Sequence, residues 1–179
     1  MTITVDSPSI TRTFEDILMT ASLSQMEAAA TWYLEAQEVA EDVAEILGVD
    51  LERGASIVSA FSPRERWATN VAKAYAFANG KPVSGLSNNL RMAETAKVSG
   101  FDALKGLKTN AFARAIAGDS DAVVIDVWMM RAAGMDTDSP NVGQYKALSQ
   151  AVRDAAAEFG ITPRTAQALI WIIVRGSAS

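Results

Sequence analysis

The sequence of 179 residues contains no cysteine and no histidine. Without cysteine the chain can form no disulfide, thiolate zinc site, iron–sulfur cluster or cysteine nucleophile. Without histidine it can form no Ser-His-Asp triad and no His-ligated metal site. We therefore expect no metal and no cofactor. Any chemistry must come from carboxylates, lysine, arginine, hydroxyls, amides or the backbone.

Long apolar runs are also absent, because no run approaches the roughly 18 residues that a membrane span needs. The N-terminus has no basic region followed by an apolar core, which a secretion signal would show. We therefore expect a cytoplasmic protein with no membrane partner. The net charge of −5 speaks mildly against nonspecific DNA binding, since contact with phosphates is electrostatic.

What the sequence does contain is helical periodicity. Hydrophobic residues make up 49% of the chain and charged residues 21%, which is a globular composition. From Thr11 onward, apolar residues recur at spacings of three and four, and no alternating pattern lasts long enough to build a sheet. The predicted class is all-α. Residues 1–10 are predicted to be a flexible tail, and residues 11–179 a single all-α domain.

Helix starts are predicted from capping residues. Asp50 is predicted to cap a short buried helix, and Thr162, which precedes a proline, is predicted to cap the last helix. Ser62 is predicted to cap a helix with Pro63 at its first position and Glu65 at its third, because each serves the N–H groups of the first turn.

A long helix is predicted over residues 24–47, and one of its faces is acidic. A solvated surface is the simpler interpretation of that face, and a surface that binds a partner is the alternative.

Asp126 follows four apolar residues and precedes a helix that begins Val127-Trp128. An aspartate in this position is usually an N-cap, which accepts backbone N–H bonds. It could also be a positioned base or stabilise positive charge on a substrate. The two interpretations are compatible, since one oxygen can cap while the other faces a substrate.

Lys108 opens the helix that precedes this region. An ordinary surface lysine is one interpretation. The other is a lysine beside a buried pocket, which can attack a carbonyl-like carbon as a Schiff-base nucleophile.

The predicted helix from Ser62 to Lys73 carries hydrogen-bond donors and a flat ring. Donors at a helix start suit phosphate, and tryptophan suits a nucleobase. The alternative is an exposed helix with a core tryptophan. The candidate substrate- or DNA-binding residues on it are Arg64, Arg66, Trp67, Asn70 and Lys73. The other tryptophans, Trp32, Trp128 and Trp171, are expected in the core from their helical spacing.

The stretch from Leu104 to Gly134 resembles the helix-hairpin-helix DNA glycosylase superfamily. It contains Lys105-Gly106 in a hairpin, then a helix, then the short apolar approach to Asp126. In the bifunctional branch of that family the lysine lies 18 positions before the aspartate, as Lys108 does here.

The resemblance implies a helical bundle whose hairpin, with Lys105 and Gly106, contacts DNA. It also implies an enzyme that flips a base out of the duplex. Asp126 would orient water or stabilise an oxocarbenium-like transition state, and Lys108 would be the possible nucleophile.

A closer resemblance is to a small phage-associated branch of this superfamily, over about residues 51–175. Its recurring blocks are Ser-Pro-Arg-x-x-Trp-x-x-Asn from Ser62, Gly-x-Lys-x-x-x-Phe from Gly106, and Gln-x-x-x-Trp from Gln167 to Trp171. The resemblance implies excision or modification of a base in phage DNA, such as a modified thymine, in the host cytoplasm.

The hairpin here has one glycine where the superfamily has two. Lys108 therefore aligns either with the family lysine or with the second glycine, and both alignments stay open. The residue two after the aspartate, commonly histidine in the family, is Trp128. An alternative function follows, a non-catalytic DNA- or protein-binding relative that kept the fold. The sequence does not assign an oligomeric state.

Overall fold

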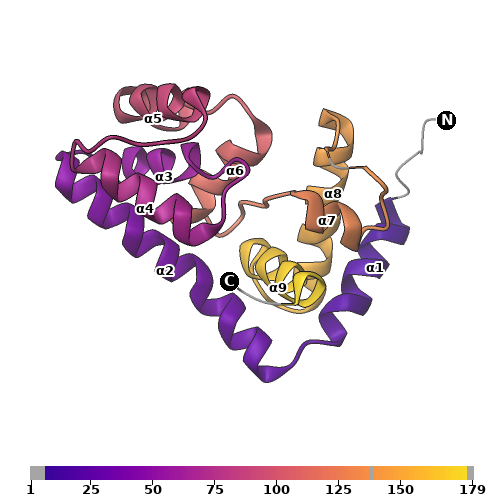
Figure 1. Ribbon diagram of the computed structural model, residues 1–179. Helices are drawn as coiled ribbons and strands as arrows, with labels where there is room; N and C mark the ends of the chain where they lie inside the picture. The colour runs from indigo at the N-terminus through magenta and orange to yellow at the C-terminus, as the bar shows by residue number, and fades with distance from the viewer. Residues whose placement is uncertain (1–6, 138, 177–179) are drawn as a thin grey trace. The chain divides into compact units, whose positions relative to one another are not determined.

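The computed structural model describes residues 7–137 and 139–176. This part of the chain contains α-helices, one 3-10 helix and no strand (Figure 1), which confirms the all-α class. In chain order the elements are α1 Ser7–Met19, α2 Leu23–Leu47, α3 Leu51–Ala60, α4 Trp67–Ala78, α5 Ser87–Ser99, η1 Gly100–Ala103, α6 Leu107–Ile116, α7 Val127–Ala132, α8 Val142–Glu158 and α9 Pro163–Arg175.

The chain divides into two compact units. The terminal unit consists of residues 1–32 and 120–179, and the central unit is Tyr33–Asp119. A single domain can contain two such units, so one domain over residues 11–179 stays a prediction.

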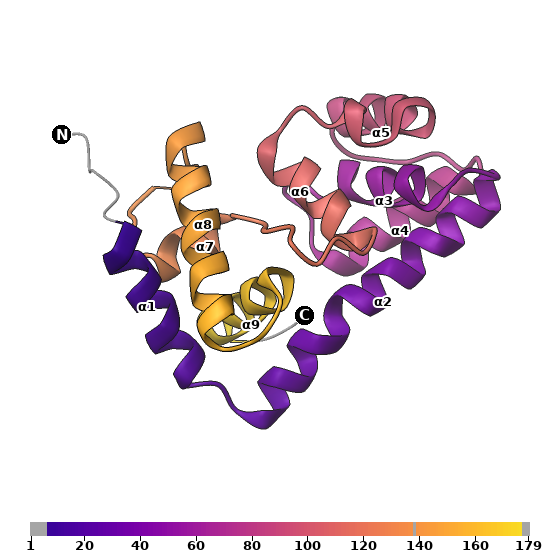
Figure 2. The same ribbon diagram turned by 180° about the vertical axis from the view of Figure 1, so that it is seen from behind.

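In the terminal unit, α8 packs against both α1 and α9, and α7 packs against α9. Both views of the ribbon show these four helices together (Figures 1 and 2). Phe14 and Leu18 of α1 are buried, as are Leu148 and Val152 of α8. Burying a large apolar side chain contributes about 1.5–3 kcal/mol, so these contacts stabilise the helices that hold the site described below.

In the central unit, α3 is the innermost helix and packs against α4, α5, α6 and η1. Every residue from Gly54 to Ala60 is buried. A Cβ at Gly54 would overlap the carbonyl oxygen of Ala40 on α2. Glycine therefore allows the two helix backbones to approach closely at this point.

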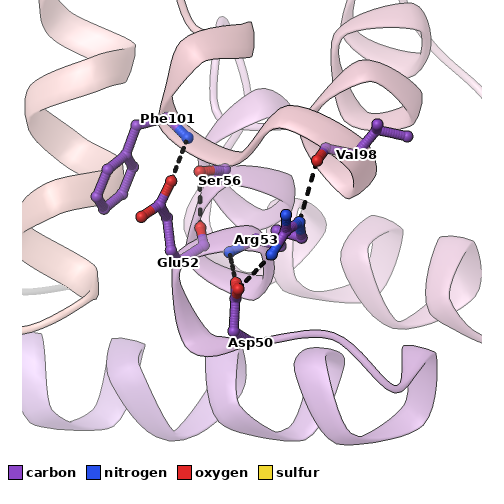
Figure 3. A network of polar contacts seen from close by, with 6 residues as sticks. All are labelled: Asp50, Glu52, Arg53, Ser56, Val98 and Phe101. Atoms are coloured by element: carbon purple, nitrogen blue, oxygen red, sulfur yellow. Dashed lines mark hydrogen bonds and ion pairs between the residues drawn. The ribbon is translucent and has the colours of Figure 1, made fainter.

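The first turn of α3 also holds the end of α5 (Figure 3). Asp50 is the N-cap and accepts the N–H of Arg53 at 2.9 Å, as predicted. The Arg53 side chain pairs with Asp50, and its Nε donates to the carbonyl of Val98 at 3.1 Å. Glu52 accepts the N–H of Phe101 at 3.2 Å. Backbone groups that helix ends leave unpaired are thus satisfied by three neighbouring side chains.

The predicted tail of residues 1–10 needs a correction at its end. α1 begins at Ser7, so residues 7–10 are helical. Pro8 is compatible with this start, because the first turn of a helix does not need the N–H that proline lacks. The part of the predicted tail over residues 1–6 lies outside the described residues.

The predicted cap at Ser62 is wrong, because α4 begins only at Trp67, with Arg66 as its N-cap. The Ser62 hydroxyl donates instead to the carbonyl of Ser59 at 2.7 Å, in the last turn of α3. Arg64 has φ of +63°, a left-handed conformation that interrupts any helix there. The hydroxyl therefore serves the end of the preceding helix, at a carbonyl that also accepts the Ser62 N–H.

Candidate functional site

Asp126 is the N-cap of α7, as predicted. Its Oδ1 accepts the backbone N–H groups of Trp128 at 2.9 Å and Met129 at 3.0 Å. Its Oδ2 accepts the indole Nε1–H of Trp171, on α9, at 2.9 Å. A carboxylate has about four acceptor positions, and three donors use most of them. The carboxylate is half-buried and fixed by two different helices.

Aromatic rings and arginines lie next to the residues that bond this carboxylate. The ring centroids of Trp171 and Trp32 lie 6.0 Å apart. The guanidinium of Arg175 lies 4.6 Å from the ring centre of Trp171, and that of Arg131 lies 4.7 Å from the ring centre of Trp128. These are cation–π distances. An arginine therefore stacks on each of the two tryptophans whose N–H groups bond Asp126.

The prediction that Trp32, Trp128 and Trp171 belong to the core is wrong, because all three are half-buried. An indole N–H needs a polar partner, which favours positions at the edge of a core. Sequence reasoning also missed Arg131 and Arg175. Their spacing of three and four residues after a tryptophan on the same helix could have indicated both stacks.

Tyr145 was also missed. This α8 residue is buried, and its hydroxyl donates to the carbonyl of Val123 at 2.9 Å while accepting the N–H of Ile125 at 3.2 Å. Burial raises the pKa of Tyr145 to about 12, against the opposing effects of the Ile125 hydrogen bond and of Arg153. The hydroxyl therefore stays protonated at neutral pH. No local pattern indicates contacts that span 20 and 22 residues.

A second group of candidate residues lies in the central unit, where the Ser-Pro-Arg block and the Gly-x-Lys block contact each other. The rings of Trp67 on α4 and Phe112 on α6 pack edge to face, with centroids 6.3 Å apart. Lys108 precedes Phe112 by one helical turn and is exposed. Residues four apart on a helix share a face, so Lys108 lies on the face of α6 that meets Trp67.

The other predicted binding residues of this group differ in how exposed they are and in whether they already have a partner. Arg64 and Arg66 are exposed. Lys73 instead forms a part-buried ion pair with Glu65. Asn70 is only 2% exposed, and its Oδ1 has no hydrogen-bond partner among the described residues. Buried polar atoms nearly always have a partner, so this oxygen is an exception.

The hairpin precedes α6. Lys105 is exposed, and Gly106 is the N-cap of α6 without a side-chain bond to the first turn. The side-chain amide of Asn110 donates to the carbonyls of Phe101 at 3.0 Å and Leu104 at 3.1 Å, which closes the turn. Gly106 has φ of −74°, an ordinary value for any residue.

Asp126 belongs to the terminal unit, whereas Lys108 and Arg64 belong to the central unit. The 18-residue spacing between Lys108 and Asp126 and the short apolar approach to Asp126 lead us to expect Lys108 or Arg64 close to Asp126, at the edge of a cleft. This stays a prediction. An open hollow of about 400 Å³ lies elsewhere in the terminal unit and is lined by Pro8, Thr11, Arg12, Glu15 and Asp154.

The described residues lack two common kinds of feature, a cluster of metal ligands and a membrane-spanning helix. Among residues 7–137 and 139–176, no three or more acidic side chains gather closely enough to hold a metal ion. Across the same residues, no helix combines the length and the apolar character that crossing a membrane requires.

The described residues thus form an all-helical chain with a capped and indole-bonded carboxylate in one unit and an aromatic pair near the exposed Lys108 in the other. The chain belongs to the family of unknown function DUF7178, whose model matches residues 2–178. No curated protein and no solved structure gives a significant match to it.

Proposed function

We propose that this protein has a glycosylase-like helical fold and acts on a nucleobase in DNA, in excision or modification of phage bases. The observation that carries the proposal is the hydrogen bond between Trp171 Nε1 and Asp126 Oδ2, 2.9 Å long across 45 residues. It joins the approach to Asp126 with the Gln-x-x-x-Trp block. The resemblance singled out these two elements separately.

The chemistry proposed for Asp126 is electrostatic. Cleavage of a glycosidic bond develops positive charge on the sugar, and a fixed carboxylate stabilises that charge. Three N–H donors hold the Asp126 carboxylate in one position. The acceptor position that they leave on Oδ2 can orient a water molecule toward the sugar.

Water is the nucleophile in this proposal. A Schiff-base lysine is activated by desolvation or by a neighbouring cation, and Lys108 is exposed. An exposed lysine suits a DNA phosphate better. Lys108 therefore joins Arg64, Arg66 and Lys105 as a candidate phosphate contact.

The second candidate is a non-catalytic relative that binds DNA or another protein. One observation favours it. Donors from its own chain occupy three of the approximately four acceptor positions of Asp126, which limits what it can offer a substrate. In this case the carboxylate serves only to join α7 to α9.

Base release from DNA tests the proposal. Duplexes that carry uracil, alkylated bases or 5-substituted thymines, together with hypermodified phage DNA, are incubated with the protein. Mass spectrometry then identifies free bases and altered nucleosides. We expect a product with the wild type and none with Asp126→Asn. Asp50→Asn is the matched control, because Asp50 is also a helix N-cap but lies outside the proposed site.

DNA binding is measured in parallel by fluorescence anisotropy. Binding that Arg64→Ala/Arg66→Ala weakens, without any product, would favour the non-catalytic alternative. If the wild type neither binds nor alters any of these DNAs, or if Asp126→Asn keeps full activity, the proposal is wrong.

A further inference from the structure

The approach to Asp126 has an unusual backbone. Residues 122–125 form neither helix nor strand, yet their four side chains are at most 7% exposed. A buried backbone needs hydrogen-bond partners for its N–H and C=O groups. Residues 122–125 belong to no ladder or helix that would supply them.

The hydroxyl of Tyr145 supplies two of these partners. It donates to the Val123 carbonyl and accepts the Ile125 N–H, at 2.9 Å and 3.2 Å. In an extended chain the carbonyl of one residue and the N–H of the residue two positions later point to the same side. One hydroxyl can therefore take the place of a neighbouring strand.

This contact ends one peptide bond before Asp126. The N–H of Ile125 is fixed to α8 through Tyr145, and the Asp126 carboxylate is fixed to α7 and to Trp171 of α9. A shift of the Ile125 backbone would carry the Cα of Asp126 with it. The angle and length of the bond between Oδ2 and the indole would then change.

We propose that Tyr145 is a positioning residue for the Asp126 carboxylate, acting through the backbone of residues 123–125. In this role its hydroxyl bonds the backbone of residues 123–125 and not a substrate. Its catalytic consequence rests on the proposed function, but the positioning itself does not.

The test uses the indole N–H signal of Trp171 in ¹H–¹⁵N NMR spectra of the full chain at neutral pH. The chain has four tryptophans, and Trp171→Phe identifies the signal by its loss. In Asp126→Asn the remaining oxygen stays with the two N–H groups of α7, and an NH₂ group replaces the Oδ2 that accepted the indole N–H, so this variant gives the shift for a broken bond. We expect Tyr145→Phe to move the Trp171 signal by at least a third of that shift, and to move the Trp67 signal of the central unit by less than a tenth.

Tyr75→Phe is the matched control. It also removes one hydroxyl that bonds within its own unit, to Asp42 Oδ2 at 2.6 Å. It should leave the Trp171 signal in place. The comparison is repeated in a Ser149→Ala background, which removes a buried hydroxyl without a partner among the described residues. That change should raise stability and keep Tyr145→Phe folded.

An unmoved Trp171 signal in folded Tyr145→Phe would overturn the proposal, and so would an equal shift in Tyr75→Phe. If the wild type releases a base, Tyr145→Phe should lower kcat at least fivefold and change KM less than twofold. If the wild type releases none, the proposed function fails, and the NMR comparison still decides the role of Tyr145.

Discussion

Asp126 and Asn70 are polar side chains, one in each unit, that differ in their hydrogen-bond partners. Three N–H groups bond the oxygens of Asp126, although this side chain is only half-buried. Asn70 is 2% exposed, and its Oδ1 has no partner among the described residues. Water can reach Asp126 more easily than Asn70, yet Asp126 has more hydrogen bonds within the described part of the protein than the Oδ1 of Asn70.

This difference distinguishes a carboxylate that joins helices from an oxygen that makes no bond to the rest of the described protein. A carboxylate with three N–H partners joins helices and holds a fixed charge, so its removal should cost stability. An unbonded buried oxygen contributes no such bond, and its burial itself costs free energy. Substitutions at the two positions should therefore have unequal effects on unfolding, and the predictions below run from the largest to the smallest.

The largest effect is expected for Asp126→Ala. This change removes an N-cap, worth about 0.5–2 kcal/mol, and leaves the half-buried indole N–H of Trp171 without its acceptor, which costs about 1–3 kcal/mol. We expect the free energy of unfolding to fall by about 3 kcal/mol, measured by urea denaturation.

Asp50→Ala provides the comparison, since it removes a cap with no indole partner and should cost about 1 kcal/mol. Equal losses in the two variants would show that the Trp171 bond contributes nothing to stability.

A smaller effect is expected at alkaline pH through Tyr145. Its pKa is raised from 10.0 to about 12, so the folded state keeps the phenolic proton that the unfolded state loses. This contribution to stability is complete below pH 10 and is lost as the pH rises toward 12, by roughly 2 kcal/mol. Urea denaturation at several pH values should show that wild type loses stability over this range more steeply than Tyr145→Phe. Parallel curves would contradict the raised pKa.

A contact in this molecule can be predicted from the sequence when its two residues are close together in the chain. Asp126, Asp50 and Thr162 were predicted as caps because the residue type, the apolar neighbours and the helix start are all local. The all-α class follows from periodicity for the same reason.

The contacts that build the site are not local. The bond between Trp171 and Asp126 spans 45 residues, and the one between Tyr145 and Val123 spans 22. No helical spacing indicates which distant residue will supply a partner. The Ser62 cap was mispredicted for a related reason, because the same hydroxyl can serve the helix before it or the helix after it.

Substitutions at Thr162 and Ser62 compare the stability contribution of a true N-cap with that of the mispredicted one. Thr162 is a true N-cap, whose hydroxyl accepts the N–H of Thr165 at 3.2 Å. Thr162→Ala should cost about 1 kcal/mol. Ser62→Ala removes only a donor to a carbonyl that already accepts the Ser62 N–H, and should cost about 0.5 kcal/mol or less. Thermal unfolding of both variants tests the order, and a larger loss for Ser62→Ala would restore its capping role.

The smallest effect is expected for Asn70→Leu. Leucine has a similar shape and a better helix propensity, and the change removes a buried oxygen that has no partner among the described residues. The free energy of unfolding should stay the same or rise by up to about 1 kcal/mol. Asn89→Leu is the matched control, because Asn89 is 5% exposed and its amide donates to the Pro63 carbonyl, so it should lower stability. A loss of 2 kcal/mol or more in Asn70→Leu would show that Asn70 is bonded after all. If Asn70→Leu keeps its stability but binds DNA more weakly, the Oδ1 of Asn70 contributes to ligand binding.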